Sequence, residues 1–176
     1  MTPGSPPRGA HPRVLLASAV EQFGEPAVVA WCGRLVRDQE RQDDPNLAWL
    51  GGTEEWPPYW RRVWGARGLL YVWADCAIDA VEVALADEHW RVREMGCKVV
   101  RVRGLDPLTG EVAPLREDRN ARVRAAAERA LVPDCDINLI SAASRSSQSP
   151  REPRRGMMDG GPAQADGMRT RLQRSS

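Results

Sequence analysis

The residues that could hold a metal ion are four cysteines and two histidines: Cys32, Cys76, Cys97, Cys135, His11 and His89. The cysteines are 44, 21 and 38 residues apart, so the chain has no Cys-x-x-Cys pair. A structural zinc site needs about four ligands at short paired spacings. We therefore expect no metal site, and we expect the thiols to act as small core hydrophobes in a reducing compartment.

Acid–base chemistry would have to use the acidic residues between positions 75 and 88, which are Asp75, Asp79, Glu82, Asp87 and Glu88. Paired carboxylates can transfer protons, but no nucleophile accompanies these. The lone His89 has no carboxylate–nucleophile constellation, and neither Gly-x-Gly-x-x-Gly nor Gly-x-x-x-x-Gly-Lys occurs. The sequence therefore predicts no catalytic residue and no cofactor, with the carboxylates serving solvation and helix capping.

Tryptophan is the most unusual feature of the composition, with seven residues, four of them (Trp56, Trp60, Trp64 and Trp73) within 18 positions. Trp is over-represented at binding hot spots, but it also packs in cores. We expect Trp60 and Trp64 to be core residues. Trp56 and Trp90 are expected near turns at the starts of helices, and both are candidate partner-binding residues.

A second candidate for partner binding is a basic column formed by Arg67, Lys98 and Arg129, which follow one another at intervals of 31 residues. In stacked repeat units, equivalent positions line up, so these side chains would hold an acidic segment of a partner. The alternative is an ordinary solvated face that Glu94 and Glu128 neutralise.

An internal repeat accounts for that spacing. Asp87-Glu88-His89-Trp90-Arg91-Val92-Arg93 and Asp118-Arg119-Asn120-Ala121-Arg122-Val123-Arg124 share Asp, Arg, Val and Arg at a constant offset of 31. Self-similarity at a period of roughly 20–50 residues is typical of stacked repeat units. Asp87, Val92, Arg93, Asp118, Val123 and Arg124 are therefore the expected structural repeat residues.

Hydrophobic periodicity predicts helices over 14–23, 27–39, 59–73, 76–86, 90–102, 107–117 and 120–132. The polar segment 40–58 is expected to be a loop with a short helix at 45–50. No segment alternates with a period of two, so we expect no sheet. The expected organisation is a disordered tail over 1–12, a repeat domain over 13–135 (clearest repeats 75–103 and 106–132) and a disordered tail rich in Arg, Ser, Gly and Pro over 136–176.

Charge and hydropathy limit the classes of partner that the chain can have. Residues 14–140 hold 16 basic and 21 acidic residues, and a net charge of −5 argues against a nucleic-acid-binding core. No run of about 18 apolar residues suggests a membrane span. The N-terminus lacks the basic head and apolar stretch of a secretory signal, so we expect a cytoplasmic protein.

The chain resembles the HEAT-repeat family of armadillo-type α-solenoids, as found in bacterial HEAT-repeat domain proteins. That family's unit is a helix, a turn bearing Asp, and Val-Arg at the start of a second helix; the matches here are Val81…Leu85…Asp87…Val92-Arg93 and Val112…Leu115…Asp118…Val123-Arg124. An earlier unit, 60–73, is degenerate, with Arg61 and Arg62 in the places of Val92 and Arg93.

The resemblance implies an all-α, right-handed solenoid of short helix pairs. It also implies that Asp87 and Asp118 cap the second helix of each pair and form a ladder with Arg93 and Arg124. Small residues at 65, 96 and 127 would let the helices approach closely.

The implied function is that of a non-enzymatic scaffold that binds another protein through its concave face. Two alternatives remain from families with HEAT-like folds. One is a DNA-binding or alkylpurine DNA glycosylase-type protein, which would need a basic groove. The other is a bilin lyase-type accessory protein.

Overall fold

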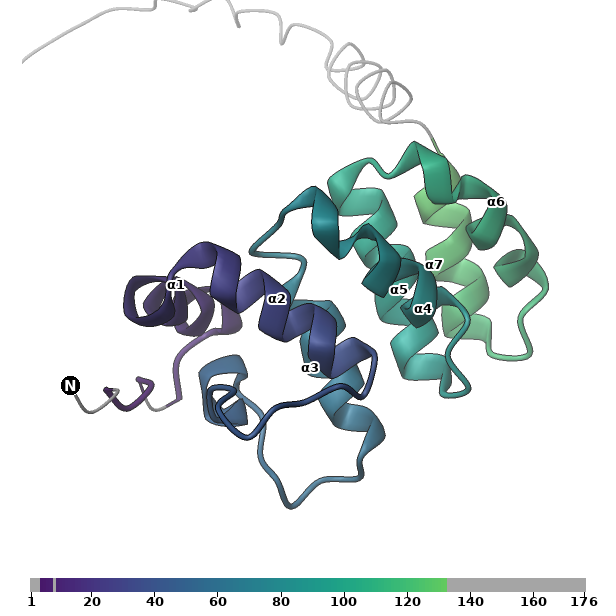
Figure 1. The fold of residues 1–176 in the computed structure, drawn as a ribbon. Coiled ribbons are helices and arrows are strands. Elements are labelled where there is room, and N and C mark those ends of the chain that lie inside the picture. Colours follow the sequence, from purple (N-terminus) through teal and green to yellow (C-terminus); the bar gives the residue numbers. More distant parts are fainter. Residues whose placement is uncertain (1–3, 8, 133–176) are drawn as a thin grey trace, which may run out of the picture. The chain divides into compact units, whose positions relative to one another are not determined.

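The computed structural model describes residues 4–7 and 9–132, and every regular element in these ranges is helical (Figure 1). The α-helices are α1 (Pro12–Phe23), α2 (Glu25–Val36), α3 (Tyr59–Gly68), α4 (Ile78–Leu85), α5 (Trp90–Arg103), α6 (Thr109–Val112) and α7 (Ala121–Leu131). Four 3₁₀ helices join them: η1 (Leu47–Leu50), η2 (Asp75–Ala77), η3 (Asp106–Leu108) and η4 (Ala113–Glu117). The all-α prediction is thus confirmed for this part of the chain, whereas the tail predicted over 136–176 lies outside it.

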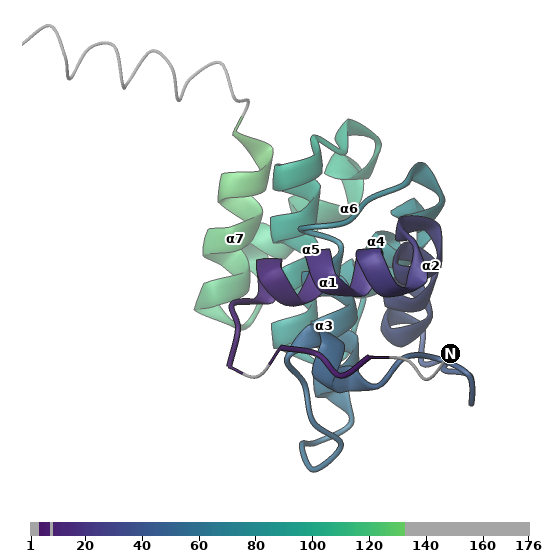
Figure 2. The same ribbon diagram turned by 90° about the vertical axis from the view of Figure 1, so that its left-hand side faces the viewer.

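The helices pack in successive pairs. Helix α2 packs on α3, α4 on α5, and the α6–η4 segment on α7. The second helices of these pairs contact one another, so that α5 lies between α3 and α7. Figure 2 shows α7 running alongside α5. Across the described residues, no helix combines the length and apolarity that a membrane crossing requires.

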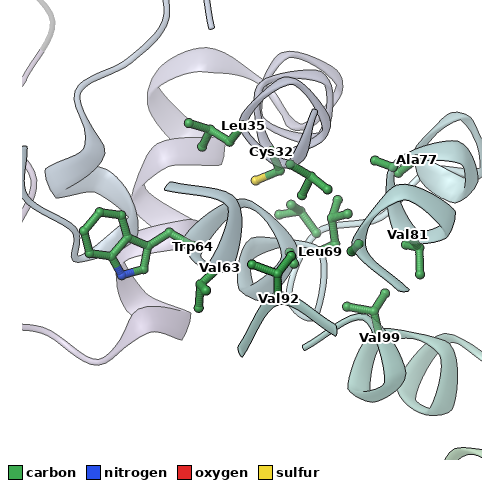
Figure 3. Packing of buried hydrophobic residues seen from close by; sticks show 14 of the residues in the cluster. Cys32, Leu35, Val63, Trp64, Leu69, Ala77, Val81, Val92 and Val99 are labelled. Atoms are coloured by element: carbon green, nitrogen blue, oxygen red, sulfur yellow. The ribbon is translucent and has the colours of Figure 1, made fainter. Parts of the chain in front are cut away.

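One continuous hydrophobic cluster joins these pairs. Cys32 of α2, Trp64 of α3, Val81 of α4 and Val92 of α5 all belong to it and have almost no exposed surface (Figure 3). Burying a side chain of this size contributes roughly 1.5–3 kcal/mol, so each pair is stabilised mainly by the apolar stripe it shares with its neighbours. Trp64 is therefore a core residue, as predicted.

Glycine lets the two helices within a pair approach closely. A Cβ on Gly65 would lie 2.6 Å from the carbonyl oxygen of Cys32 and 2.8 Å from the Cβ of Leu35, both on α2. At the equivalent position of the next pair, a Cβ on Gly96 would lie 3.1 Å from a methyl group of Leu85 on α4. The close approach predicted at 65 and 96 is thus confirmed.

Two helix predictions were wrong in their bounds. The helix predicted over 59–73 ends at Gly68, and the chain turns there so that Leu69 and Val72 both reach the core. The helix predicted over 107–117 is divided among η3, α6 and η4. Pro114 has no N–H to continue an α-helix, which accounts for the change to 3₁₀ geometry at η4. In contrast, the short helix expected at 45–50 is present as η1.

The turns before α5 and α7 are equivalent in detail. The carboxylate of Asp87 accepts a hydrogen bond from the backbone N–H of His89, and that of Asp118 accepts one from Asn120, both at 2.7 Å. The helices themselves are capped by the side chains of His89 and Asn120. The prediction that the aspartates are the caps was therefore wrong, because each Asp lies two residues earlier and orders the turn instead.

An Arg–Asp ladder links successive pairs. Nε of Arg62 lies 2.7 Å from Oδ2 of Asp87, and Nε of Arg93 lies 2.7 Å from Oδ2 of Asp118. The predicted Arg93–Asp118 contact is confirmed. Asp87, however, pairs with Arg62, which occupies the place of Arg93 one repeat earlier. Arg124 donates to the backbone carbonyl of Asp118 at 2.8 Å rather than to a carboxylate.

Burial opposes ionisation of Asp118, but hydrogen bonds from Arg93 and from the N–H of Asn120 outweigh it and lower the pKa of this carboxyl group. The same balance acts on Arg62, where burial is outweighed by Asp38 and Asp87 and the pKa is raised. Both groups of the ladder are therefore held in their charged forms.

Candidate partner-binding face

Charge is segregated between the first and second helices of the pairs. Helices α3, α5 and α7 carry eleven basic and two acidic residues. The segments 75–85 and 106–117, which supply the first helices of the second and third pairs, carry one basic and six acidic residues, while α2 carries one of each. The net charge of the folded part is acidic, as expected from the sequence, but the second helices are strongly basic and form a basic side.

Two basic stripes on neighbouring helices make up the open part of that side. Positions 91, 98 and 101 lie on one side of α5, and 122 and 129 on the equivalent side of α7, because residues three, four or seven apart share a helix face. We call Arg91, Lys98, Arg101, Arg122 and Arg129 the basic face. The carboxylate within it belongs to Glu94, which lies 2.8 Å from Nζ of Lys98 and 3.4 Å from Nη2 of Arg122.

The guanidinium of Arg91 lies over two indole rings, those of Trp60 and Trp90. Its guanidinium carbon lies 4.4 Å from the ring centroid of Trp90 and 5.2 Å from that of Trp60. The guanidinium carbon of Arg122 also lies near Trp90, at 5.5 Å from its ring centroid. Indoles and guanidinium groups therefore alternate from α3 through α5 to α7. Such cation–π contacts contribute about 0.5–1 kcal/mol each at exposed sites and fix the guanidinium plane.

The N–H groups of Arg91 remain open. Among the residues that the structure describes, its guanidinium makes no hydrogen bond or ion pair, although its backbone N–H donates to Nδ1 of His89 at 3.3 Å. A guanidinium presents five donors in a planar fork that suits a carboxylate. Within the described part of the chain, the arrangement therefore offers a guanidinium fork that no carboxylate of the chain occupies.

The predicted basic column is only partly assembled. Lys98 and Arg129 lie on the basic face, but Arg67 is mostly buried and donates to the backbone carbonyl of Leu50 in η1. Burial lowers the pKa of Arg67, with a small opposing effect from Tyr71. Because the loop 37–58 covers α3 at this position, the column begins at α5.

The two predicted tryptophans lie at different places. Trp90 is half-buried within the basic face, between Arg91 and Arg122. Trp56 is 48% exposed and packs against Trp60 and Trp64, with ring centroids 4.8 and 5.5 Å away. Trp56 thus lies beside the N-terminal end of α3 and extends the aromatic surface next to the basic face.

The six predicted structural residues lie in the two equivalent turns. Val92 and Val123 are fully buried, and Asp87, Arg93 and Asp118 belong to the ladder. Arg124 lies on the exposed side of α7.

Sequence reasoning missed Arg91 and Arg122. Trp60, which was expected in the core, packs against the core cluster but is only partly buried. The signal was present, because Trp60, Arg91 and Arg122 follow one another at 31 residues. A count of charge for each helix, rather than for the whole domain, would have found the basic side.

Other chemistry finds little support. Within the described ranges, no three His, Cys, Asp or Glu side chains are close enough to hold a metal ion. Cys32 and Cys97 are buried, and burial raises the pKa of each thiol to about 12. His89 stacks on Tyr59 with ring centroids 3.5 Å apart and caps α5, so its contacts are structural.

The chain matches no protein-family model, no curated protein and no solved structure.

Proposed function

We propose that this chain is a non-enzymatic, HEAT-like helical-repeat scaffold that binds an acidic segment of a partner protein on its basic face. The two equivalent turns and the Arg–Asp ladder support the solenoid part of this proposal, since the same contacts recur at a 31-residue interval. The buried thiols of Cys32 and Cys97 suit a cytoplasmic, reducing environment.

The observation that carries the proposal is the guanidinium of Arg91, which lies over the rings of both Trp60 and Trp90 and has no carboxylate partner among the described residues. A cation fixed in this way loses little side-chain entropy when it binds, which is the usual advantage of a preorganised site. Bidentate bonds between arginine and carboxylate are roughly twice as strong as neutral hydrogen bonds. An Asp or Glu side chain of a partner is therefore the preferred ligand at this point.

A nucleic-acid-binding function is the second candidate, because the basic face and its tryptophans are also features that bind single strands. The placement of the rings favours the protein partner. Bases bind such proteins by stacking on open aromatic faces, but Arg91 lies against Trp60 and Trp90, and Arg122 lies against Trp90. At Arg91, the groups that the described residues leave unpaired are therefore N–H donors, and the exposed ring of Trp56 lies beside the face rather than within it. No observation favours a bilin lyase.

Fluorescence anisotropy of the full-length chain with three labelled probes tests the proposal. The probes are a Glu-rich peptide, its Gln-substituted counterpart and a single-stranded oligonucleotide of equal charge. We expect the Glu-rich peptide to bind most tightly. Arg91→Glu should weaken that binding by about tenfold or more, since a hydrogen bond to a charged group contributes roughly 1.5–3 kcal/mol.

Arg116→Glu supplies the matched control, because Arg116 is exposed on η4, among the acidic first-helix segments. It makes the same change of charge but should leave peptide affinity within about twofold, as expected for a remote exposed charge screened by salt. Equal loss in both variants would reduce the proposal to a general charge effect. Tighter binding of the oligonucleotide than of the peptide would favour the nucleic-acid function.

A further inference from the structure

The outer side of α7 exposes the stripe that α3 and α5 use to contact the next pair. This stripe contains Arg62 and Ala66 of α3 together with Leu69, which follows that helix, and in α5 it contains Arg93, Cys97 and Val100. All of these residues are buried or nearly so, and the two arginines pair with the following turn. The equivalent residues of α7 are Arg124, Glu128 and Leu131, of which the first two are exposed.

The residue at position 128 indicates that α7 does not pack against a further helix pair in the way that α3 and α5 do. The small apolar residue at this place, Ala66 or Cys97, is replaced by the charged Glu128. A partner must therefore offer an acid to Arg124 and a base to Glu128. Among the described residues, no ion pair uses either group.

Arg124 is already oriented for such a contact. Its Nη1 donates to the carbonyl of Asp118 at 2.8 Å, just as Nη1 of Arg93 donates to the carbonyl of Asp87 at 2.7 Å. In Arg93 this leaves Nε and Nη2 to hold the carboxylate of Asp118, at 2.7 and 3.1 Å. The same edge of Arg124 has no acceptor within the part of the chain that the structure describes.

We propose that the stripe Ala121–Arg124–Glu128–Leu131 of α7 is an interface between two copies of this chain, which pack their α7 helices antiparallel about a two-fold axis. The spacing of three, four and three residues is the seam spacing of packed helices. With the axis at the height of Ala126, Arg124 of each copy faces Glu128 of the other. Ala121 then faces Leu131, which places a small residue opposite a large one.

The charges of Arg124 and Glu128 favour a second copy of this chain as the partner of the stripe. A two-fold contact brings the same surface of both copies together, so it must be self-complementary. Arg124 and Glu128 lie two residues on either side of Ala126, and antiparallel packing pairs them twice. The interface is distinct from the basic face, because Arg122 and Arg129 lie on another side of α7, given about 100° of rotation per residue. A single 11-residue helix buries little area, so we expect a weak, concentration-dependent dimer.

Sedimentation velocity of the full chain over a concentration series tests the proposal. Wild-type protein should dimerise, and Arg124→Glu or Glu128→Arg should each raise the dissociation constant by about tenfold or more, because like charges then face each other twice. The double variant Arg124→Glu/Glu128→Arg should restore association. An equimolar mixture of the two single variants should form a heterodimer, since one chain carries two carboxylates in the stripe and the other two cations.

Arg13→Glu serves as the control, because it makes the same change of charge as Arg124→Glu at an exposed position on α1. This variant should dimerise like the wild type. Circular dichroism checks that each variant is folded. The proposal is overturned if the wild type stays monomeric at millimolar concentration. It is equally overturned if the wild type associates but neither single variant changes the constant, or if a chain ending at Val132 dimerises while the full chain does not, which would make residues 133–176 the occupant.

Discussion

Removal of the nearly buried carboxylate of Asp118 should destabilise the protein more than removal of an exposed carboxylate such as that of Glu40. The Asp118 side chain is 6% exposed and its partner Arg93 10%. In Asp118→Ala, Nε and Nη2 of Arg93 lose their acceptor and the N–H of Asn120 loses its bond. A broken buried pair costs about 3–5 kcal/mol, and partial exposure reduces this, so we expect a loss of about 3 kcal/mol.

The measurement is urea unfolding at neutral pH, arranged as a double-mutant cycle with Arg93→Met. We expect a coupling free energy of about 1.5 kcal/mol or more between the two positions. Glu40→Ala provides the comparison, because Glu40 pairs with Arg61 at 2.9 Å, with side chains 32% and 37% exposed. An exposed pair of this kind contributes about 0–1 kcal/mol.

The pH dependence supplies a second check. The pKa of Asp118 is lowered in the folded protein, since the bonds from Arg93 and Asn120 outweigh the effect of burial. Its contribution is therefore present above the unfolded pKa of about 3.9 and is lost as pH falls through the folded value. The reasoning is refuted if Asp118→Ala costs no more than Glu40→Ala, or if the coupling with Arg93 is close to zero.

Three further predictions concern stability and reactivity. Gly65→Ala should lower the free energy of unfolding by about 2–3 kcal/mol, since its Cβ would meet the backbone of Cys32, whereas Gly110→Ala, in open space, should raise it by up to ~1 kcal/mol; urea titration measures both. His89→Ala should cost about 1 kcal/mol through the lost cap. Burial lowers the pKa of His89, partly opposed by Asp87, so wild-type stability should fall as pH drops through about 6.5 and the Ala variant should lose that dependence. In the native protein iodoacetamide should modify the exposed Cys76 but not Cys32, whose pKa burial raises to about 12, as peptide mass spectrometry would show; modification of Cys32 without unfolding would contradict the packing.

The repeat was predictable because its residues recur at a fixed interval. The resemblance implied that an Asp of one turn meets an Arg of the adjacent unit, but the sequence did not show which residues pair; the structure pairs Asp118 with Arg93. The role of Arg62 was missed because the motif around it is degenerate, with no Val-Arg and no Asp in its own turn. Of the Asp, Arg, Val and Arg positions of that motif, only the last Arg is retained, and it is the position that the ladder uses.

The candidate site was harder to predict, because it depends on which surfaces the loops cover. Arg67 and Lys98 are equivalent in sequence, yet η1 covers one and leaves the other open. The order of cations and indoles around Arg91 requires three helices to lie side by side. The net charge of the folded part was also misleading, because it sums the charges of the acidic first helices and the basic second helices.

The central claim is that the fork of Arg91 is open to a carboxylate, and nuclear magnetic resonance of the side-chain N–H groups tests it most directly. A Glu-rich peptide is titrated into the ¹⁵N-labelled chain. The Nε–H signals of Arg91 and Arg122 and the indole signal of Trp90 should shift together, while those of Arg62 and Arg93, which are held in the ladder, should not. Unchanged Arg91 and Arg122 signals at saturating peptide, or shifts confined to residues outside the basic face, would contradict the account.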